Sequence, residues 1–178
     1  MSIKKDFESK IKMELKKELN LSSVQAVPRF EKIVINMGIG KMRDNKTFVE
    51  ECVSDLAAIT GQHPNKRPSK VSISNFKLRE GQIVGIAVTL RGEKMWDFYE
   101  KLVKIVLPRV KDFRGVTKKN FDDSGNYNLG LREHLVFPEV DANKITYNKP
   151  LQITVKTTTR DSKNAYSLLK ATGMPFKD

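Results

Sequence analysis

The chain has 178 residues, in which 33 Lys and Arg outweigh 21 Asp and Glu to give a formal charge of +12. This length suffices for one domain with its own core, and such an excess of positive charge favours a polyanionic partner: RNA, DNA or an anionic membrane. A single cysteine, Cys52, excludes an internal disulfide and is expected as a buried thiol, and no apolar stretch reaches the length of a membrane span. The sequence also lacks the strongly amphipathic cationic helix that a basic membrane-surface protein needs, so we predict no membrane association.

The first third of the chain predicts helix, strand and helix. Apolar residues recur every four positions from Ile3 to Leu19, which indicates an amphipathic helix that Ser2 can cap. Alternation of apolar and polar residues over 32–37 predicts a strand. A second helix is expected over 46–60, with Gly61 as its C-terminal cap.

The middle of the chain predicts a loop followed by a hairpin. Residues 61–70 contain two prolines and several basic residues, and we expect no regular structure there. Strands are predicted over 71–76 and 82–90, joined around Glu80 and Gly81. The second strand has a bulky face, expected to meet helices, and a small face at 83, 85, 87 and 89 that allows another backbone to come close.

The last part predicts a helix over 93–107 stopped by Pro108, a turn-rich segment at 121–130, a strand at 151–158 and a helix that begins after Asp161 and ends at Gly173. Strands and helices are therefore mixed, with at least one hairpin. This order predicts an α+β fold, an antiparallel sheet with helices packed mainly on one face.

The positive charge is concentrated in the middle of the chain. Residues 61–94 carry seven Lys or Arg against two Glu, and residues 101–119 carry seven against one acid. Basic loops beside a sheet face of small and polar residues suit a phosphate backbone. Phe76 lies among these basic residues, where it either stacks on a base or belongs to the core.

Motifs of catalysis and metal binding fail on inspection. Gly38-Ile39-Gly40-Lys41 lacks the spacing and the Ser or Thr of a phosphate loop. The segment at 122–125 lacks the final Glu of a calcium loop, because position 131 is Leu. Two histidines and one cysteine do not make a zinc pattern. We predict no catalytic residue, no metal and no cofactor.

Several short motifs occur in the order found in one protein family: VPR at 27–29, NMGIG at 36–40, DL at 55–56, ITGQ at 59–62, FKLREG at 76–81, VTLRGE at 88–93, PRVKDFRG at 108–115, GNYNLG at 125–130, FPE at 137–139 and GMPF at 173–176. Together they make the chain resemble the bacterial L-five family of large-subunit ribosomal proteins. Residues 68–70 and 147–150 depart from the usual pattern of that family.

The resemblance implies a single RNA-binding domain over 1–178, somewhat like an RNA-recognition fold, in a cytoplasmic ribosomal protein that is not an enzyme. It implies binding to 5S rRNA through these residues: Asn36, Gly38, Gly40, Gln62, Lys66, Lys70, Phe76, Thr89 and Arg91. It also implies contact with P-site tRNA through Lys77, Arg79, Glu80 and Gly81.

Further partners follow from the same resemblance. They are 23S rRNA in the central protuberance, neighbouring large-subunit proteins, and a small-subunit head protein across an intersubunit bridge. The bridge surface is expected within residues 109–140.

Overall fold

The structure is a computed structural model that describes residues 3–141 and 147–177, so the expected cap at Ser2 lies outside the described residues. The chain divides into two compact units. Unit 1 comprises Met1–Ile33, Leu90–Leu129 and Thr154–Asp178, and unit 2 comprises Val34–Thr89 and Gly130–Ile153. The single domain expected from the sequence stays a prediction.

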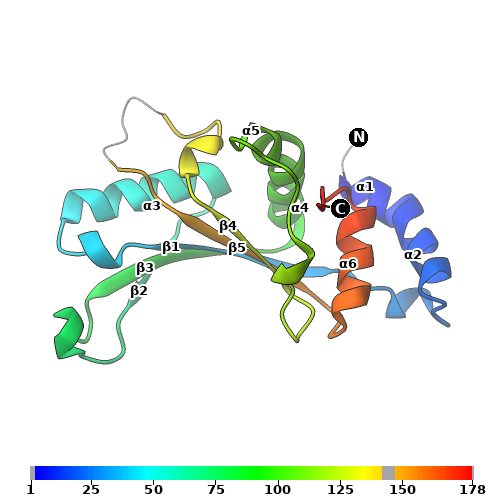
Figure 1. Cartoon of the computed structure of the whole chain (residues 1–178), viewed down its shortest axis with the longest axis horizontal. Coiled ribbons are helices and arrows are strands. Elements are labelled where there is room, and N and C mark those ends of the chain that lie inside the picture. Colours follow the sequence, from blue (N-terminus) through cyan, green and yellow to red (C-terminus); the bar gives the residue numbers. More distant parts are fainter. Residues whose placement is uncertain (1–2, 142–146, 178) are drawn as a thin grey trace. The chain divides into compact units, whose positions relative to one another are not determined.

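An open antiparallel sheet contains five strands in the order β2-β3-β1-β5-β4. The strands are β1 Phe30–Gly38, β2 Asn65–Pro68, β3 Ile83–Leu90, β4 Tyr127–Leu131 and β5 Leu151–Thr157. Helix α3 follows β1 and helix α4 follows β3, so the order β1-α3-β2-β3-α4-β5 is the split βαβ arrangement, with β4 added at one edge. The predicted α+β class is confirmed (Figure 1).

The main helical segments are α1 Ile3–Asp6, α2 Lys12–Glu18, α3 Lys46–Thr60, α4 Gly92–Lys101, α5 Leu107–Arg109 and α6 Ser162–Ala171, with π-helical segments at Phe7–Ile11 and Leu102–Val106. Short 3-10 turns include η3 Gly40–Met42 and η4 Ser74–Phe76. The helices predicted over 46–60 and after Asp161 are confirmed. The helix predicted to stop at Pro108 instead continues to Arg109, because proline is tolerated in the first turn of the helical segment α5.

In unit 2, helix α3 packs on one face of the sheet (Figure 1). Asn45 caps its start, since its side-chain oxygen accepts a hydrogen bond from the Phe48 N–H at 3.2 Å, and Gly61 ends it in a left-handed conformation. The buried residues of this unit come from α3 and the strands: Ile35, Met37, Phe48, Val49, Cys52, Leu56, Ile59, Ile86 and Val88. Cys52 is a buried free thiol, as predicted.

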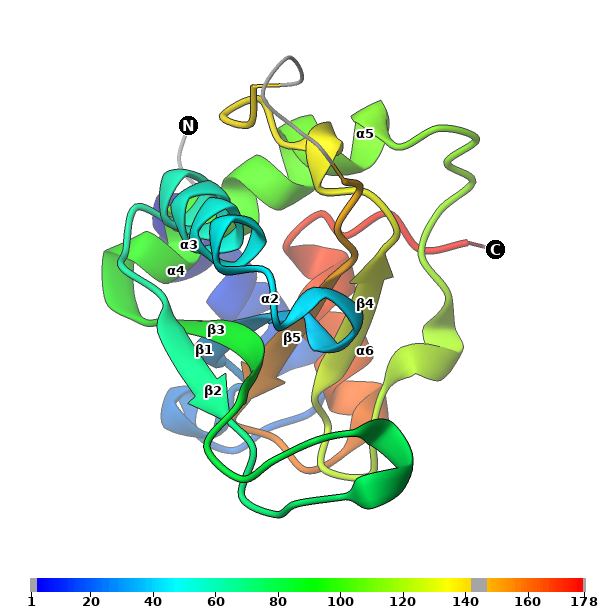
Figure 2. The same cartoon turned by 90° about the vertical axis from the view of Figure 1, so that its left-hand side faces the viewer.

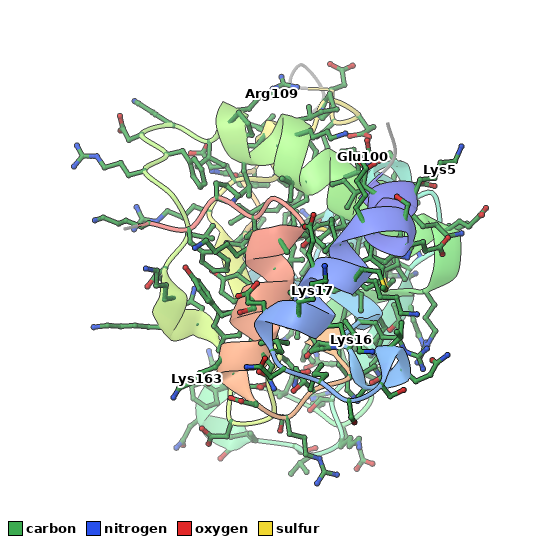
Figure 3. All side chains as sticks on the ribbon, turned by 90° about the vertical axis from the view of Figure 1, so that its right-hand side faces the viewer. Lys5, Lys16, Lys17, Glu100, Arg109 and Lys163 are labelled. Carbon is green, nitrogen blue, oxygen red and sulfur yellow. The ribbon has the colours of Figure 1, made fainter. Side chains whose placement is uncertain are left out.

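In unit 1, aromatic side chains join the N-terminal helical segments and the first residue of β1 to α4. The rings of Phe7 and Trp96 lie 5.3 Å apart, and those of Phe30 and Tyr99 lie 4.7 Å apart. Figure 3 shows Glu100 of α4 beside α1, where its carboxylate accepts a hydrogen bond from the Ile3 N–H at 3.2 Å. These contacts fix the first helical segments on α4.

The predicted hairpin is wrong in its first strand. On the side away from β1, the partner of β3 is β2, and residues 71–76 form a loop in which only Ile73 makes an isolated bridge, to Leu78. Val71 and Ile73 alternate with polar residues, and this pattern predicted a strand with one buried face. Both side chains are instead exposed. Pro68 is compatible with β2 because it ends an edge strand at an irregularity in the register.

Strand β4 was missed, because residues 121–130 appeared turn-rich. Tyr127, Leu129 and Leu131 are buried and alternate with residues of the opposite face, as strand geometry requires. Gly130 weakens the sequence signal without breaking the strand.

Candidate nucleic-acid interface

Unit 2 presents one sheet face on which the described residues of that unit place no helix (Figure 1). We call it the open face. On β3 it carries Gly85, Ala87 and Thr89, which alternate with Ile86, Val88 and Leu90 of the other face. Gly85 and Ala87 are themselves buried between their neighbours, and Thr89 is half-buried. On β1 it carries Asn36, because a Cβ added at Gly85 would lie 3.6 Å from the Asn36 side-chain oxygen. The predicted division of β3 into a bulky and a small face is therefore present, and a Cβ added at Gly85 would lie 3.4 Å from the Met37 carbonyl oxygen of the neighbouring strand β1.

Two predicted RNA-binding residues are held together at the end of β3. The side-chain amide of Gln62 donates a hydrogen bond to the backbone carbonyl of Thr89 at 3.3 Å. Gln62 is exposed, and Asn36 and Thr89 are half-buried, so apolar side chains enclose none of the three. Amide and hydroxyl groups at such a surface can pair with base edges or with ribose 2′-hydroxyls.

The register of β2 decides which basic residue joins the open face. Arg67 pairs with Gly85 and Asn65 with Ala87, whereas Lys66 pairs with Ile86. Directly paired residues point to the same side of a sheet, so Asn65 and Arg67 lie on the open face and Lys66 on the other. Sequence reasoning missed Asn65 and Arg67, because it expected no strand there and only the register identifies them.

The loop of residues 69–82, shown in green in Figures 1 and 2, is folded on itself. Gly81 N–H donates to the Ser69 carbonyl at 3.0 Å, and Glu80 N–H donates to the Ser72 hydroxyl at 2.9 Å. Lys77 adopts a left-handed conformation at φ 47°. The predicted contacts of this loop are all exposed: Lys70, Phe76, Lys77, Arg79, Glu80 and Gly81. Phe76 is 69% exposed, so it is not a core residue.

Arg43 connects this loop to the turn after β1. Its guanidinium donates to the Gly40 carbonyl at 2.8 Å, and also to the carbonyls of Phe76 at 2.9 Å and Lys77 at 2.8 Å. Two predicted RNA-binding segments, the glycine turn at 38–40 and the loop, are thus joined by one side chain. No pattern in the sequence singled out Arg43.

A polar cluster lies under α3. Lys149, only 2% exposed, places its ammonium 2.8 Å from the Asp55 carboxylate and 3.6 Å from that of Glu51. His134 is buried and accepts the Lys149 backbone N–H on Nδ1 at 3.2 Å, so its own proton is on Nε2, 3.5 Å from Asp55. Burial alone would raise the pKa of Asp55, but His134 and Lys149 outweigh it and lower the pKa below 3.8. Burial raises the pKa of the neighbouring Cys52 thiol to about 11.

Unit 1 carries the remaining predicted positions. Arg91 is exposed at the start of α4, and Lys111, Arg114 and Lys119 of the basic segment are exposed as well. Figure 3 shows other cations of this unit, among them Lys17 and Lys163, which are exposed on α2 and α6. Positive charge therefore lies on the surface of both units.

Within residues 3–141 and 147–177, no helix is long and apolar enough to cross a bilayer. The same residues contain no group of three or more acidic, histidine or cysteine side chains placed to hold a metal ion.

Two family models together match most of the chain. The model described as ribosomal protein L5 matches residues 23–79, and the model of the C-terminus of the same ribosomal family matches residues 83–176. The chain belongs to the ribosomal protein L5 family. As a member of this family it is an RNA-binding protein of the ribosome. It takes part in translation and is not an enzyme.

Individual relatives match over nearly their full length. The large ribosomal subunit protein uL5 of Acidobacterium capsulatum is 48% identical over 175 residues, which cover 98% of this chain and 96% of the relative. Proteins of the same name from Anaeromyxobacter sp. (strain K) and Brachyspira hyodysenteriae are each 47% identical, and the alignments cover 97% and 95% of those relatives. This L5-family chain thus spans the length of its relatives.

Proposed function

We propose that this chain binds 5S rRNA through the open face of unit 2 and helps to attach it to 23S rRNA. The coarser role follows from the family: the chain is a structural constituent of the large ribosomal subunit and acts in the cytoplasm. The observation that supports the finer role is the open face itself, where Asn36, Gln62 and Thr89 lie at the surface of a sheet with small residues between them.

The chemistry of this face suits folded RNA. Gly85 and Ala87 have too little side chain to keep a sugar-phosphate backbone at a distance, and the neighbouring amide and hydroxyl groups can both donate and accept hydrogen bonds. Arg67 adds a cation on the same face. In this proposal Lys70 and Arg91 hold phosphates, and Gly38 and Gly40 allow the RNA backbone to approach. Lys66, which the sequence analysis expected among the phosphate contacts, lies on the opposite side of β2 and contributes less than Arg67.

The test is a mobility-shift titration of the full chain with 5S rRNA at several salt concentrations, with an unrelated RNA of equal length as competitor. The logarithm of the affinity should fall with the logarithm of salt with a slope of about −0.7 to −0.9 for each phosphate contact. Asn36→Ala and Thr89→Val should weaken 5S rRNA binding by about two- to tenfold, as expected for one lost hydrogen bond.

Thr47→Val is the matched control, because Thr47 is an exposed threonine in the first turn of α3 and not on the open face. It should leave the affinity unchanged. A protein that binds an unrelated RNA of equal length as tightly as 5S rRNA at physiological salt would refute the proposal.

We also propose that the 69–82 loop contacts P-site tRNA, through Lys77, Arg79 and the Glu80-Gly81 turn. The support is the exposure of these residues on a loop that its own hydrogen bonds already shape. Neighbouring large-subunit proteins and a small-subunit head protein, the latter at residues 109–140, complete the proposed partners. Ribosomes carrying Lys77→Ala together with Arg79→Ala should release P-site tRNA faster than wild-type ribosomes and retain normal amounts of 5S rRNA.

A further inference from the structure

A cavity of about 770 Å³ lies in unit 2 beside the loop of residues 69–82. Its side-chain walls come mainly from Met42, Phe48, Phe76, Leu78, Val84 and Tyr147. We call it the loop pocket. Its volume falls within the range of about 300–1,000 Å³ that small-molecule sites span, and its walls are mostly apolar, as such sites require.

Three aromatic rings from three segments line the loop pocket. Phe48 of α3 and Tyr147 make an edge-to-face pair with ring centroids 5.8 Å apart, and Phe76 belongs to the loop. Phe48 is buried, but Phe76 is 69% and Tyr147 47% exposed. Aromatic rings that stay exposed to solvent beside an apolar cavity are expected where a flat aromatic ligand packs against them and covers them.

The pocket is formed before any ligand arrives. Arg43, which also lines it, ties the Gly40 carbonyl on one wall to the Phe76 and Lys77 carbonyls on another. The Ile39 N–H donates to the Val84 carbonyl at 3.1 Å and fixes a third wall. A ligand therefore does not have to order the loop, which lowers the entropic cost of binding.

The charge around the pocket selects the class of ligand. Arg43 is among the residues that line the pocket, and the exposed Lys77 and Arg79 flank the lining residue Leu78 in the sequence. An apolar, aromatic cavity with cations at its margin fits a nucleotide, whose base can enter the cavity while its phosphates stay at the charged margin. A neutral apolar peptide would use the rings but not the cations.

We propose that the loop pocket takes one unstacked base of the ribosomal RNA that unit 2 binds, with the base packed against Phe76 and Tyr147. This inference rests on the proposed binding of 5S rRNA and adds a specific site to it. Arg43 acts as a positioning residue, because it holds the walls of the pocket in place through hydrogen bonds to backbone carbonyls. The rings of Phe76 and Tyr147, and not Arg43, contact the base.

The test uses the full chain and 5S rRNA in which each unpaired adenine is replaced, one at a time, by the fluorescent base 2-aminopurine, and each unpaired nucleotide in turn by an abasic residue. One 2-aminopurine position, or a neighbour of the inserted base, should change its fluorescence on binding, and Phe76→Leu and Tyr147→Leu should reduce the change. One abasic position should weaken binding about tenfold, the effect of one lost base–aromatic stack.

Arg43→Lys keeps the charge but replaces the two terminal guanidinium nitrogens, which reach carbonyls on two segments, by a single nitrogen. It should therefore reduce the fluorescence change less than Phe76→Leu but more than the control Val71→Ala. Val71 is 61% exposed in the same loop and does not line the pocket. Tight 5S rRNA binding with no responsive position and no sensitive abasic site would overturn the pocket proposal alone. Absence of 5S rRNA binding would overturn both proposals.

Discussion

The ammonium of Lys149 lies 2.8 Å from the carboxylate of Asp55, although the Lys149 side chain is almost completely buried. The pair links the segment before β5 to α3, and the ammonium also lies 5.3 Å from the centre of the Phe48 ring. A buried charge keeps its ionised form only when such partners surround it, so each member of this cluster depends on the others.

Replacement of Lys149 by Met should destabilise the protein strongly. The variant leaves the Asp55 carboxylate without its closest cation. Loss of one partner from a buried ion pair lowers the free energy of unfolding, here by about 2–4 kcal/mol, because the side chain of Asp55 is 21% exposed and solvent screens part of its charge. Urea unfolding followed by circular dichroism measures the change. Lys156→Met is the matched control, because Lys156 makes an exposed pair with Glu31 at 3.2 Å, and it should cost at most about 1 kcal/mol. Equal losses in the two variants would contradict a special role for Lys149.

Acid should weaken the folded state through Asp55. The pKa of this carboxyl is lower in the folded chain than its ordinary 3.8, so the unfolded chain takes up the proton first as pH falls. The stabilisation is complete above about pH 5 and declines as pH falls through the ordinary pKa of 3.8 toward the lower pKa of the folded chain. Unfolding free energies of wild type and Asp55→Asn, measured from pH 6 to 3, should converge toward the acid end. A constant difference across this range would exclude Asp55 as the titrating group.

Two glycines should respond in opposite ways to alanine. Gly125 has φ 71°, and a Cβ there would lie 2.4 Å from the Thr159 carbonyl oxygen. Gly130 has open space around an added Cβ, with nothing within 4 Å. Gly125→Ala should lower the free energy of unfolding by about 2–4 kcal/mol through strain and steric conflict, whereas Gly130→Ala should be neutral or slightly stabilising. Thermal melts of both variants test this, and a tolerated Gly125→Ala would mean that the turn relaxes freely.

Arg67 and Lys66 are adjacent cations on opposite sides of β2, and they test which side meets RNA. If 5S rRNA lies on the open face, Arg67→Ala should reduce the magnitude of the salt slope by about one phosphate contact and weaken binding more than Lys66→Ala. Both variants remove one charge from an exposed position, so a difference between their affinities for 5S rRNA shows which side of the strand the RNA contacts. A larger loss of affinity in Lys66→Ala would indicate that the RNA binds the face that α3 covers.

The sequence by itself determined the family, the fold class and most of the helices and strands. Ile33, Ile35 and Met37 alternate in β1, and all three are fully buried, because a strand that packs against helices on one face must carry apolar residues at every second position. Residues 46–60 form the predicted helix, which ends at Gly61 as expected. This end is also a local feature of the sequence, because glycine adopts the left-handed conformation that closes a helix. The likeness to the family came from short motifs in order, which need no coordinates.

Only the tertiary structure decided which segment pairs with β3, which side of β2 each basic residue occupies, and how Arg43 reaches the loop. Asn65–Pro68 is an exposed edge strand with no apolar alternation, so its pairing depends on backbone hydrogen bonds that leave no pattern in the side chains. The Arg43 contacts join residues more than 30 positions apart through backbone carbonyls, which every residue possesses. Such contacts are invisible in a sequence because the accepting group carries no residue identity.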